Sequence, residues 1–211
     1  MFRKAAVIPV VHLDRHRKAQ MIESILENFL GHPVRGYRVL DIGCGNGDIS
    51  AYFALNNEQY GVDVSDRRRV KNSTFDFSIV TSEALPFDDG FFDVVISHHV
   101  IEHVNDQKLH LREIHRVLKS DGSAYLATPN RTSPLMKGHI GNDRVLRYRE
   151  VEPLLRDAGF VCTDYSPRVV REPDRFYADW RIGRLVPGFL VRALRFLIPS
   201  HIYTLRPLKE A

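Results

Sequence analysis

The chain has 211 residues, of which 44% are hydrophobic and 27% are charged, and its formal net charge is +4. This composition is that of one globular domain of ordinary size, which excludes a disordered or low-complexity chain. No run of eighteen or more uncharged apolar residues occurs, which excludes a membrane-spanning helix, and two cysteines are too few for a disulfide framework. We therefore expect a cytoplasmic protein.

Apolar residues recur at helical spacing over residues 12–30, and Gly31 ends this pattern. Short apolar runs then alternate with helical patterns along the chain. Strands are predicted at 37–42, 59–64, 75–80, 91–97, 123–129 and 160–167, and helices at 47–56, 106–119 and 149–160. This alternation predicts an α/β fold, a Rossmann-like doubly wound sheet that is mostly parallel and has helices on both faces.

The tail carries the basic excess of the chain. From Arg168 onward there are nine Lys or Arg and four Asp or Glu residues. Residues 186–200 form an apolar segment that contains Arg192 and Arg195, and we predict a helix there. Two interpretations remain open, a lid packed beside an acceptor pocket and a basic amphipathic helix at an anionic membrane surface.

Residues 201–206 are predicted to return as the last, antiparallel strand of the sheet. We accordingly divide the single domain into an N-terminal helical cap (1–35), a cofactor-binding core (36–167) and a basic amphipathic tail (168–211).

Three glycines, Gly43, Gly45 and Gly47, alternate directly after the first predicted strand. Glycine lets the backbone approach a ligand closely at the carboxyl ends of parallel strands. The dinucleotide pattern G-x-G-x-x-G would need a glycine where Asp48 stands, and a carboxylate there would repel a pyrophosphate. The spacing therefore favours a ligand with a positive centre. Asp63, twenty residues after Gly43, ends the second strand and can accept both hydroxyls of a ribose.

With these motifs the chain resembles the class I S-adenosylmethionine-dependent methyltransferases, in particular the type 11 group that acts on small molecules. It also has some likeness to ubiquinone-pathway O-methyltransferases. The resemblance covers about residues 36–165 and rests on VLDIGCGNG, GVDVS, SEALPFDDGFFDVVISHHVIEHV, EIHRVLKSDGSAYLATPN and REVEPLLRDAGF. It implies a methyltransferase with S-adenosylmethionine as cofactor and a small-molecule acceptor, with a hydroxyl oxygen preferred and a lipid-linked acceptor considered.

The resemblance also implies roles for single residues. Asp41 and the backbone of the glycine loop hold the amino-acid end of the cofactor, and Asp63 holds its ribose. Thr81 stands where the family often has an acid for the adenine amino group, and a hydroxyl is a weaker acceptor there. The whole predicted cofactor set is Asp41, Gly43, Cys44, Gly45, Gly47, Asp63, Val64, Thr81, Ser82, Glu83 and His98.

An acceptor hydroxyl must lose its proton, and four histidines are candidates for this task. They are His98, His99 and His103 near the fourth strand, and His139 in the loop after the fifth strand. His99, Glu102 and His103 would share one face of a helix, a spacing that suits a divalent metal. We expect no metal there, with Glu102 and His103 packing or capping instead.

Two further histidines, His110 and His115, lie in the predicted helix 106–119 and are expected at the surface.

A non-catalytic partner subunit and a nucleic-acid methyltransferase are the two alternatives to a small-molecule methyltransferase. A non-catalytic partner subunit has no need of the intact glycine loop and Asp63. A nucleic-acid methyltransferase would carry an Asx-Pro-Pro-aromatic motif where the chain reads SHHV, so nucleic acid is not an expected partner.

Overall fold

The computed structural model describes residues 13–69, 75–134, 144–172, 174, 187–193 and 197–208. These residues form one seven-stranded sheet in the order β3-β2-β1-β4-β5-β7-β6. The strands are β1 (Arg38–Ile42), β2 (Glu58–Asp63), β3 (Asp76–Ile79), β4 (Phe92–His98), β5 (Leu118–Pro129), β6 (Phe160–Asp164) and β7 (Ser200–Pro207). The helices are α1 (Leu13–Leu30), α2 (Asp48–Phe53), α3 (Gln107–Val117), α4 (Tyr148–Asp157), α5 (Ser166–Arg171) and α6 (Gly188–Ala193).

The sheet is parallel except at β7. Strand β1 pairs in parallel with both β2 and β4, whereas β7 runs antiparallel between β5 and β6. The predicted Rossmann-like sheet with an antiparallel last strand is therefore confirmed. The strand order changes direction between β1 and β4, and in sheets of this kind ligands bind at the carboxyl ends beside such a switch.

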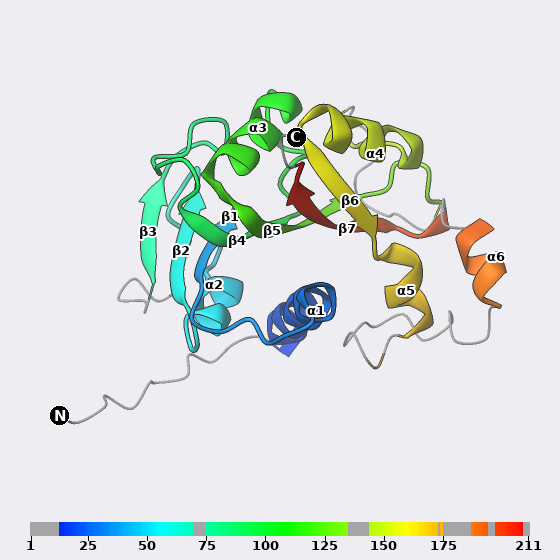
Figure 1. Cartoon of the computed structure of the whole chain (residues 1–211), viewed down its shortest axis with the longest axis horizontal. Helices are drawn as coiled ribbons and strands as arrows, with labels where there is room; N and C mark the ends of the chain where they lie inside the picture. Colours follow the sequence, from blue (N-terminus) through cyan, green and yellow to red (C-terminus); the bar gives the residue numbers. More distant parts are fainter. Residues whose placement is uncertain are drawn as a thin grey trace.

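Helices cover both faces of the sheet (Figure 1). Helices α1, α2 and α5 lie on one face, and α3 and α4 lie on the other. Each layer contributes buried apolar side chains, such as Ile22 and Ile25 of α1 on the first face and Leu111 and Ile114 of α3 on the second. The apolar spacing that predicted these helices is thus the spacing of the residues that form the two cores.

The predicted strand 160–167 is too long, because β6 ends at Asp164 and α5 follows it. The Asp164 carboxylate accepts hydrogen bonds from the Ser166 backbone N–H at 2.9 Å and from the Ser166 hydroxyl at 2.6 Å. This local bond competes with the backbone hydrogen bonds that would continue the strand. Helix α5 begins at Ser166, and Pro167 is tolerated in its first turn. The predicted helix 106–119 also ends earlier, at Val117, because Leu118 is already extended and pairs with Phe92.

The predicted tail helix 186–200 is described only in part. Helix α6 covers residues 188–193, and β7 begins at Ser200, so the helix does not extend to that residue. The side chains of Arg192 and Arg195 lie outside the described residues, and the last strand, predicted at 201–206, is confirmed as β7. No helix in the described part of the chain is long and apolar enough to cross a membrane.

His110 is buried, so its predicted place at the surface is wrong. It lies in α3 on the same face as Ile114 and Val117, at helical spacings of four and seven. Its Nε2 lies 3.2 Å from the Ser97 hydroxyl oxygen, and burial lowers its pKa to about 4. His110 is thus a neutral core residue. His115 is half-buried and its ring packs edge-on against Phe160.

Candidate functional site

The glycine loop joins β1 to α2 with three left-handed residues. Gly43, Gly45 and Gly47 have φ angles of 68°, 55° and 80°. A side chain at Gly43 would come within 2.5 Å of the Val100 Cγ2, so glycine is needed here for contact with the chain itself as well as for its backbone angle. Gly47 precedes α2, which begins at the buried Asp48.

Asp41 is a buried carboxyl group at the end of β1, beside the glycine loop. The Ser50 hydroxyl donates a hydrogen bond to its Oδ2 at 2.6 Å. Burial raises the pKa of Asp41 to about 7, although the Ser50 hydrogen bond and the charge of Arg15 act against this rise. A cation bound next to Asp41 would relieve the cost of its ionisation, so the carboxyl group is suited to a positively charged ligand group.

Asp63 ends β2, and both of its carboxylate oxygens are engaged. Its Oδ2 accepts a hydrogen bond from the Gly45 N–H at 2.9 Å, and its Oδ1 accepts one from the Ser65 N–H at 3.3 Å. The Arg67 Nη2 also lies 3.1 Å from Oδ1 and 3.3 Å from Oδ2. The Arg67 side chain is 65% exposed, whereas the Asp63 side chain is 3% exposed. Sequence reasoning missed Arg67, for which no motif gave a signal.

The predicted cofactor residues that follow β2 and β3 divide into two groups. Val64 is 66% exposed, Thr81 is exposed and Ser82 is buried. Glu83 instead accepts hydrogen bonds at 2.9 Å from the backbone N–H groups of Asn105 and Asp106. Glu83 therefore stabilises the segment before α3, in which Asp106 is the N-cap of the helix.

Cys44, the remaining loop residue of the predicted set, is buried, and burial raises the pKa of its thiol. It is a structural thiol at neutral pH, because the thiolate form is disfavoured there. The predicted cofactor residues around the glycine loop thus converge at the carboxyl ends of β1 and β2.

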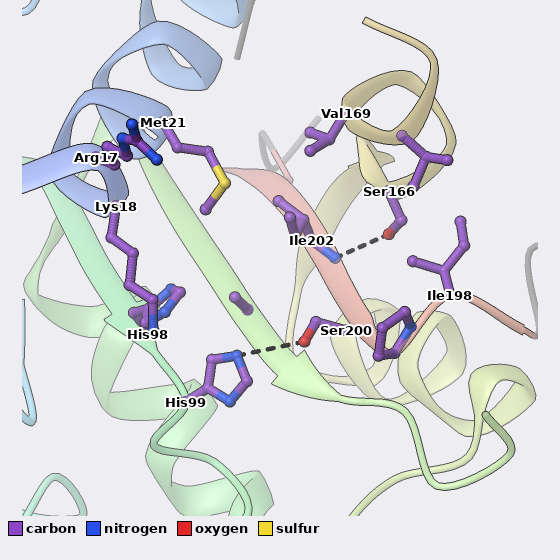
Figure 2. A pocket seen from close by; sticks show the side chains of 13 residues that line it. Arg17, Lys18, Met21, His98, His99, Ser166, Val169, Ile198, Ser200 and Ile202 are labelled. Atoms are coloured by element: carbon purple, nitrogen blue, oxygen red, sulfur yellow. Dashed lines mark hydrogen bonds between the residues drawn. The ribbon is translucent and has the colours of Figure 1, made fainter. Parts of the chain in front are cut away.

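A cavity of about 270 Å³ lies beside the carboxyl end of β4. Figure 2 shows side chains that reach it from α1, from α5, from the end of β4 and from the segment around β7. It is lined by Arg17, Lys18, Met21, His98, His99, Ala127, Ser166, Val169, Val170, Ile198, Pro199, Ser200 and Ile202. Sequence reasoning predicted only the two histidines, because the other residues come from segments distant in sequence.

His98 connects this cavity to the glycine loop. The preceding residue, Ser97, pairs with Ile42, so the end of β4 lies beside the start of the loop. The His98 Nδ1 lies 3.3 Å from the Tyr125 hydroxyl oxygen. Burial, together with His99 and the charge of Lys18, holds the pKa of His98 well below its usual range. His98 is therefore neutral.

The segment that contains His99, Glu102 and His103 is a turn and not a helix, so the three side chains do not share a helical face. The Glu102 Oε1 lies 3.3 Å from the His99 Nδ1 and 4.0 Å from the His103 Nε2. The His103 side chain is 60% exposed and is not part of the cavity lining. Among the described residues no group of three His, Cys, Asp or Glu is arranged to hold a metal ion. His139 lies outside the described residues.

Comparison with known sequences finds proteins that are similar to part of this chain. A model of a methyltransferase domain, of the type 11 group, matches residues 40–126. A ubiquinone biosynthesis O-methyltransferase from Rhizobium etli is 29% identical over 156 residues, which are 63% of this chain and 63% of that protein. Its counterpart from Rhizobium rhizogenes is 32% identical over 138 residues, which are 59% of this chain and 56% of that protein. The chain thus spans about three fifths of the length of these relatives.

Solved structures share the fold. The plantazolicin methyltransferase BpumL, in complex with a monoazolic desmethylPZN analog and SAH, has a TM-score of 0.67 at 17% identity, with 93% of this chain and 84% of that chain covered. The cyclase SpnF has a TM-score of 0.62 at 22% identity, with 93% and 81% covered. A fold shared with a cyclase does not settle the reaction. The solved structures therefore show the fold alone, and the family model adds that residues 40–126 are similar to a methyltransferase domain of the type 11 group.

Proposed function

We propose that the protein transfers the methyl group of S-adenosylmethionine to a hydroxyl oxygen of a small molecule. The observation that carries this proposal is the position of His98. It belongs to the predicted cofactor set and also lines the cavity at the end of β4. A cofactor held along the glycine loop would therefore present its reactive end toward that cavity.

The residues at the carboxyl ends of β1 and β2 fit this cofactor. Asp63 offers a carboxylate for the ribose hydroxyls, and the exposed Val64 beside it offers an apolar contact for a ring. Asp41, whose pKa burial has raised, is suited to the ammonium group of the methionyl part. Bound there, the cofactor supplies an activated methyl group on a positively charged sulfur, so the protein has mainly to position the acceptor and remove its proton.

The cavity at the end of β4 suits an acceptor with both apolar and polar parts. Met21, Val169 and Ile198 give it apolar walls, while Arg17 and Lys18 bring positive charge from α1. The apolar walls support an acceptor with a hydrocarbon portion. The names of the sequence relatives, ubiquinone biosynthesis O-methyltransferases, point the same way.

Calorimetric titration with S-adenosylhomocysteine tests the cofactor, with NAD⁺ as the parallel control. We expect micromolar binding of S-adenosylhomocysteine alone. Binding of NAD⁺ alone would contradict the proposal, and binding of neither ligand would favour a non-catalytic partner subunit. After cofactor binding, transfer of a radiolabelled methyl group to phenolic and lipid-linked hydroxyl compounds tests the acceptor class.

The contact between Arg67 and Asp63 leads to a separate prediction about the affinity for S-adenosylhomocysteine. A ribose that binds Asp63 must share or displace the Arg67 guanidinium, so Arg67→Gln is expected to raise the affinity for S-adenosylhomocysteine. The Arg67 side chain is 65% exposed, so solvent weakens its attraction to Asp63, and the gain in affinity should not exceed about fivefold. Arg69→Gln in the same loop removes the same charge and serves as the control. A lower affinity in Arg67→Gln alone would show that the guanidinium helps to hold the ligand.

We further propose a peripheral contact between the tail and an anionic membrane. Phe189 of α6 is 75% exposed and the neighbouring Leu190 is also exposed, so the helix presents two adjacent apolar side chains that would suit a membrane interface. The wild type is expected to co-sediment with vesicles that contain anionic lipid, and Phe189→Asp should reduce the bound fraction severalfold. Leu208→Asp, at another exposed apolar position, is the control. Absence of wild-type sedimentation would remove the proposal.

A further inference from the structure

His99 adopts a backbone conformation that is uncommon for a residue with a side chain. Its φ angle is 58°, and it is the one non-glycine residue with positive φ in the described part of the chain. Its N–H donates to the Ala127 carbonyl at 2.9 Å, which ties the strained residue to β5 at the end of the sheet. Strain of this kind persists where the surrounding structure enforces it, and it is often found at functional sites.

The His99 ring lies between a buried carboxylate and the cavity. The Glu102 side chain is fully buried, and its Oε1 is 3.3 Å from the His99 Nδ1. On the other side of the ring, Nε2 is 3.5 Å from the Ser200 hydroxyl oxygen (Figure 2). Both His99 and Ser200 line the cavity. A carboxylate at Nδ1 favours the tautomer with the proton on Nδ1, which leaves the Nε2 lone pair directed toward the side of the hydroxyl group.

The neighbouring His98 is less suited to accept a proton. Its Nδ1 is next to the buried Tyr125 hydroxyl, and its Nε2 is fully covered. Lys18 and Arg15 add positive charge near it, and no carboxylate is in contact with it among the described interactions. A protonated His98 would have no counter-charge at its ring, whereas a protonated His99 would face Glu102.

We propose that His99 is the general base of the methyl transfer and that Glu102 is its positioning residue. The inference rests on the proposed function, because it requires an acceptor with a hydroxyl group. The hydroxyl proton passes to the His99 Nε2 while the oxygen bonds to the methyl carbon, and the carbon–sulfur bond breaks with both electrons remaining on sulfur. His99 then releases the proton to solvent through the cavity.

Ring-nitrogen NMR tests the tautomer without cofactor or acceptor. In ¹⁵N-histidine-labelled wild type at a pH where the imidazole is neutral, His99 is expected to carry its proton on Nδ1. Glu102→Gln should shift the population toward the Nε2-protonated form, because the amide no longer attracts the Nδ1 proton as a carboxylate does. His99→Asn assigns the signal, since asparagine tolerates positive φ. A His99 protonated on Nε2 in the wild type would overturn the proposal.

Chemical rescue tests the base in turnover. His99→Gly removes the imidazole and fits the positive φ, so the variant is expected to fold and to bind S-adenosylhomocysteine within about twofold of the wild type. The rate of methyl transfer should fall about a hundredfold or more, and free imidazole should restore part of it. His32→Gln, an exposed histidine outside the cavity, is the control and should keep its rate.

Failure of the proposed function and failure of the role of His99 give different experimental results. If the wild type does not bind S-adenosylhomocysteine, the proposed function fails, whatever the tautomer of His99. If it binds, and His99→Gly keeps its rate or imidazole restores none of a lost rate, the proposed function stands and the role of His99 is wrong.

Discussion

Replacing Asp63 with alanine is expected to weaken the binding of S-adenosylhomocysteine by about a hundredfold. The change removes a buried carboxylate whose charge-assisted hydrogen bonds to the two ribose hydroxyls would contribute about 3 kcal/mol together. It also removes the acceptor for the Gly45 N–H, which holds the glycine loop against β2. Both effects act on the same ligand, so a large loss is expected from one substitution. Isothermal titration measures it.

Two further variants separate charge from loop geometry. Asp63→Asn keeps the shape of the side chain and one carbonyl oxygen, so it should lose less affinity than Asp63→Ala. Asp66→Asn changes a neighbouring acid that is paired with Arg68, and it should stay within a few-fold of the wild type. An unchanged affinity in Asp63→Ala would show that the ribose does not bind at this carboxylate.

Replacing Asp41 with asparagine is expected to have opposite effects on stability and on cofactor binding. Burial raises the pKa of Asp41 to about 7, whereas an unfolded aspartate titrates near 4. Between these values the folded protein holds a proton that the unfolded chain has lost. The contribution of Asp41 therefore favours folding least above pH 7, and the free energy of unfolding decreases as pH rises through this interval.

An asparagine at position 41 is neutral, so it does not have the free-energy cost of ionising a buried carboxyl group. We therefore expect Asp41→Asn to be more stable than the wild type at pH 8, by roughly 2–4 kcal/mol, and equal to it near pH 3. The variant should nevertheless bind S-adenosylhomocysteine at least tenfold more weakly at pH 8, because the ammonium group loses its charged partner. Thermal unfolding and titration calorimetry at several pH values measure both effects. A variant less stable than the wild type at pH 8 would contradict this account of Asp41.

Much of the fold could be predicted from the sequence because its signals are local. The apolar runs gave the strands of the core, and the tail strand at 201–206 is confirmed as β7. The errors also have local causes. The Asp164 carboxylate accepts a hydrogen bond from the Ser166 N–H, and this bond ends β6. An acidic residue within an apolar strand pattern does not by itself predict such a turn. His110 was misplaced because its polarity outweighed its spacing to Ile114 and Val117.

The candidate site was less predictable, because it is assembled from distant segments. The glycine loop and Asp63 come from adjacent elements with a known spacing, so a motif could find them. The cavity depends on α1, α5 and β7, and Ser200 reaches His99 across 101 positions of sequence. The role of Glu102 was likewise hidden, because helical spacing suggested a shared face, whereas a turn and the positive φ of His99 bring the carboxylate to Nδ1.

The position of β7 between β5 and β6 has a consequence for biosynthesis. In the described sheet β6 pairs with β7 and with no other strand. During translation β6 therefore leaves the ribosome before β7. It remains an unpaired edge strand while the residues between the two strands are made. Strand β7 also brings Ser200 and Ile202 to the cavity. A nascent chain that stops before residue 200 would hold the glycine loop and Asp63 but lack one wall of the acceptor cavity, so the parts predicted to hold the cofactor would emerge before the acceptor site is complete.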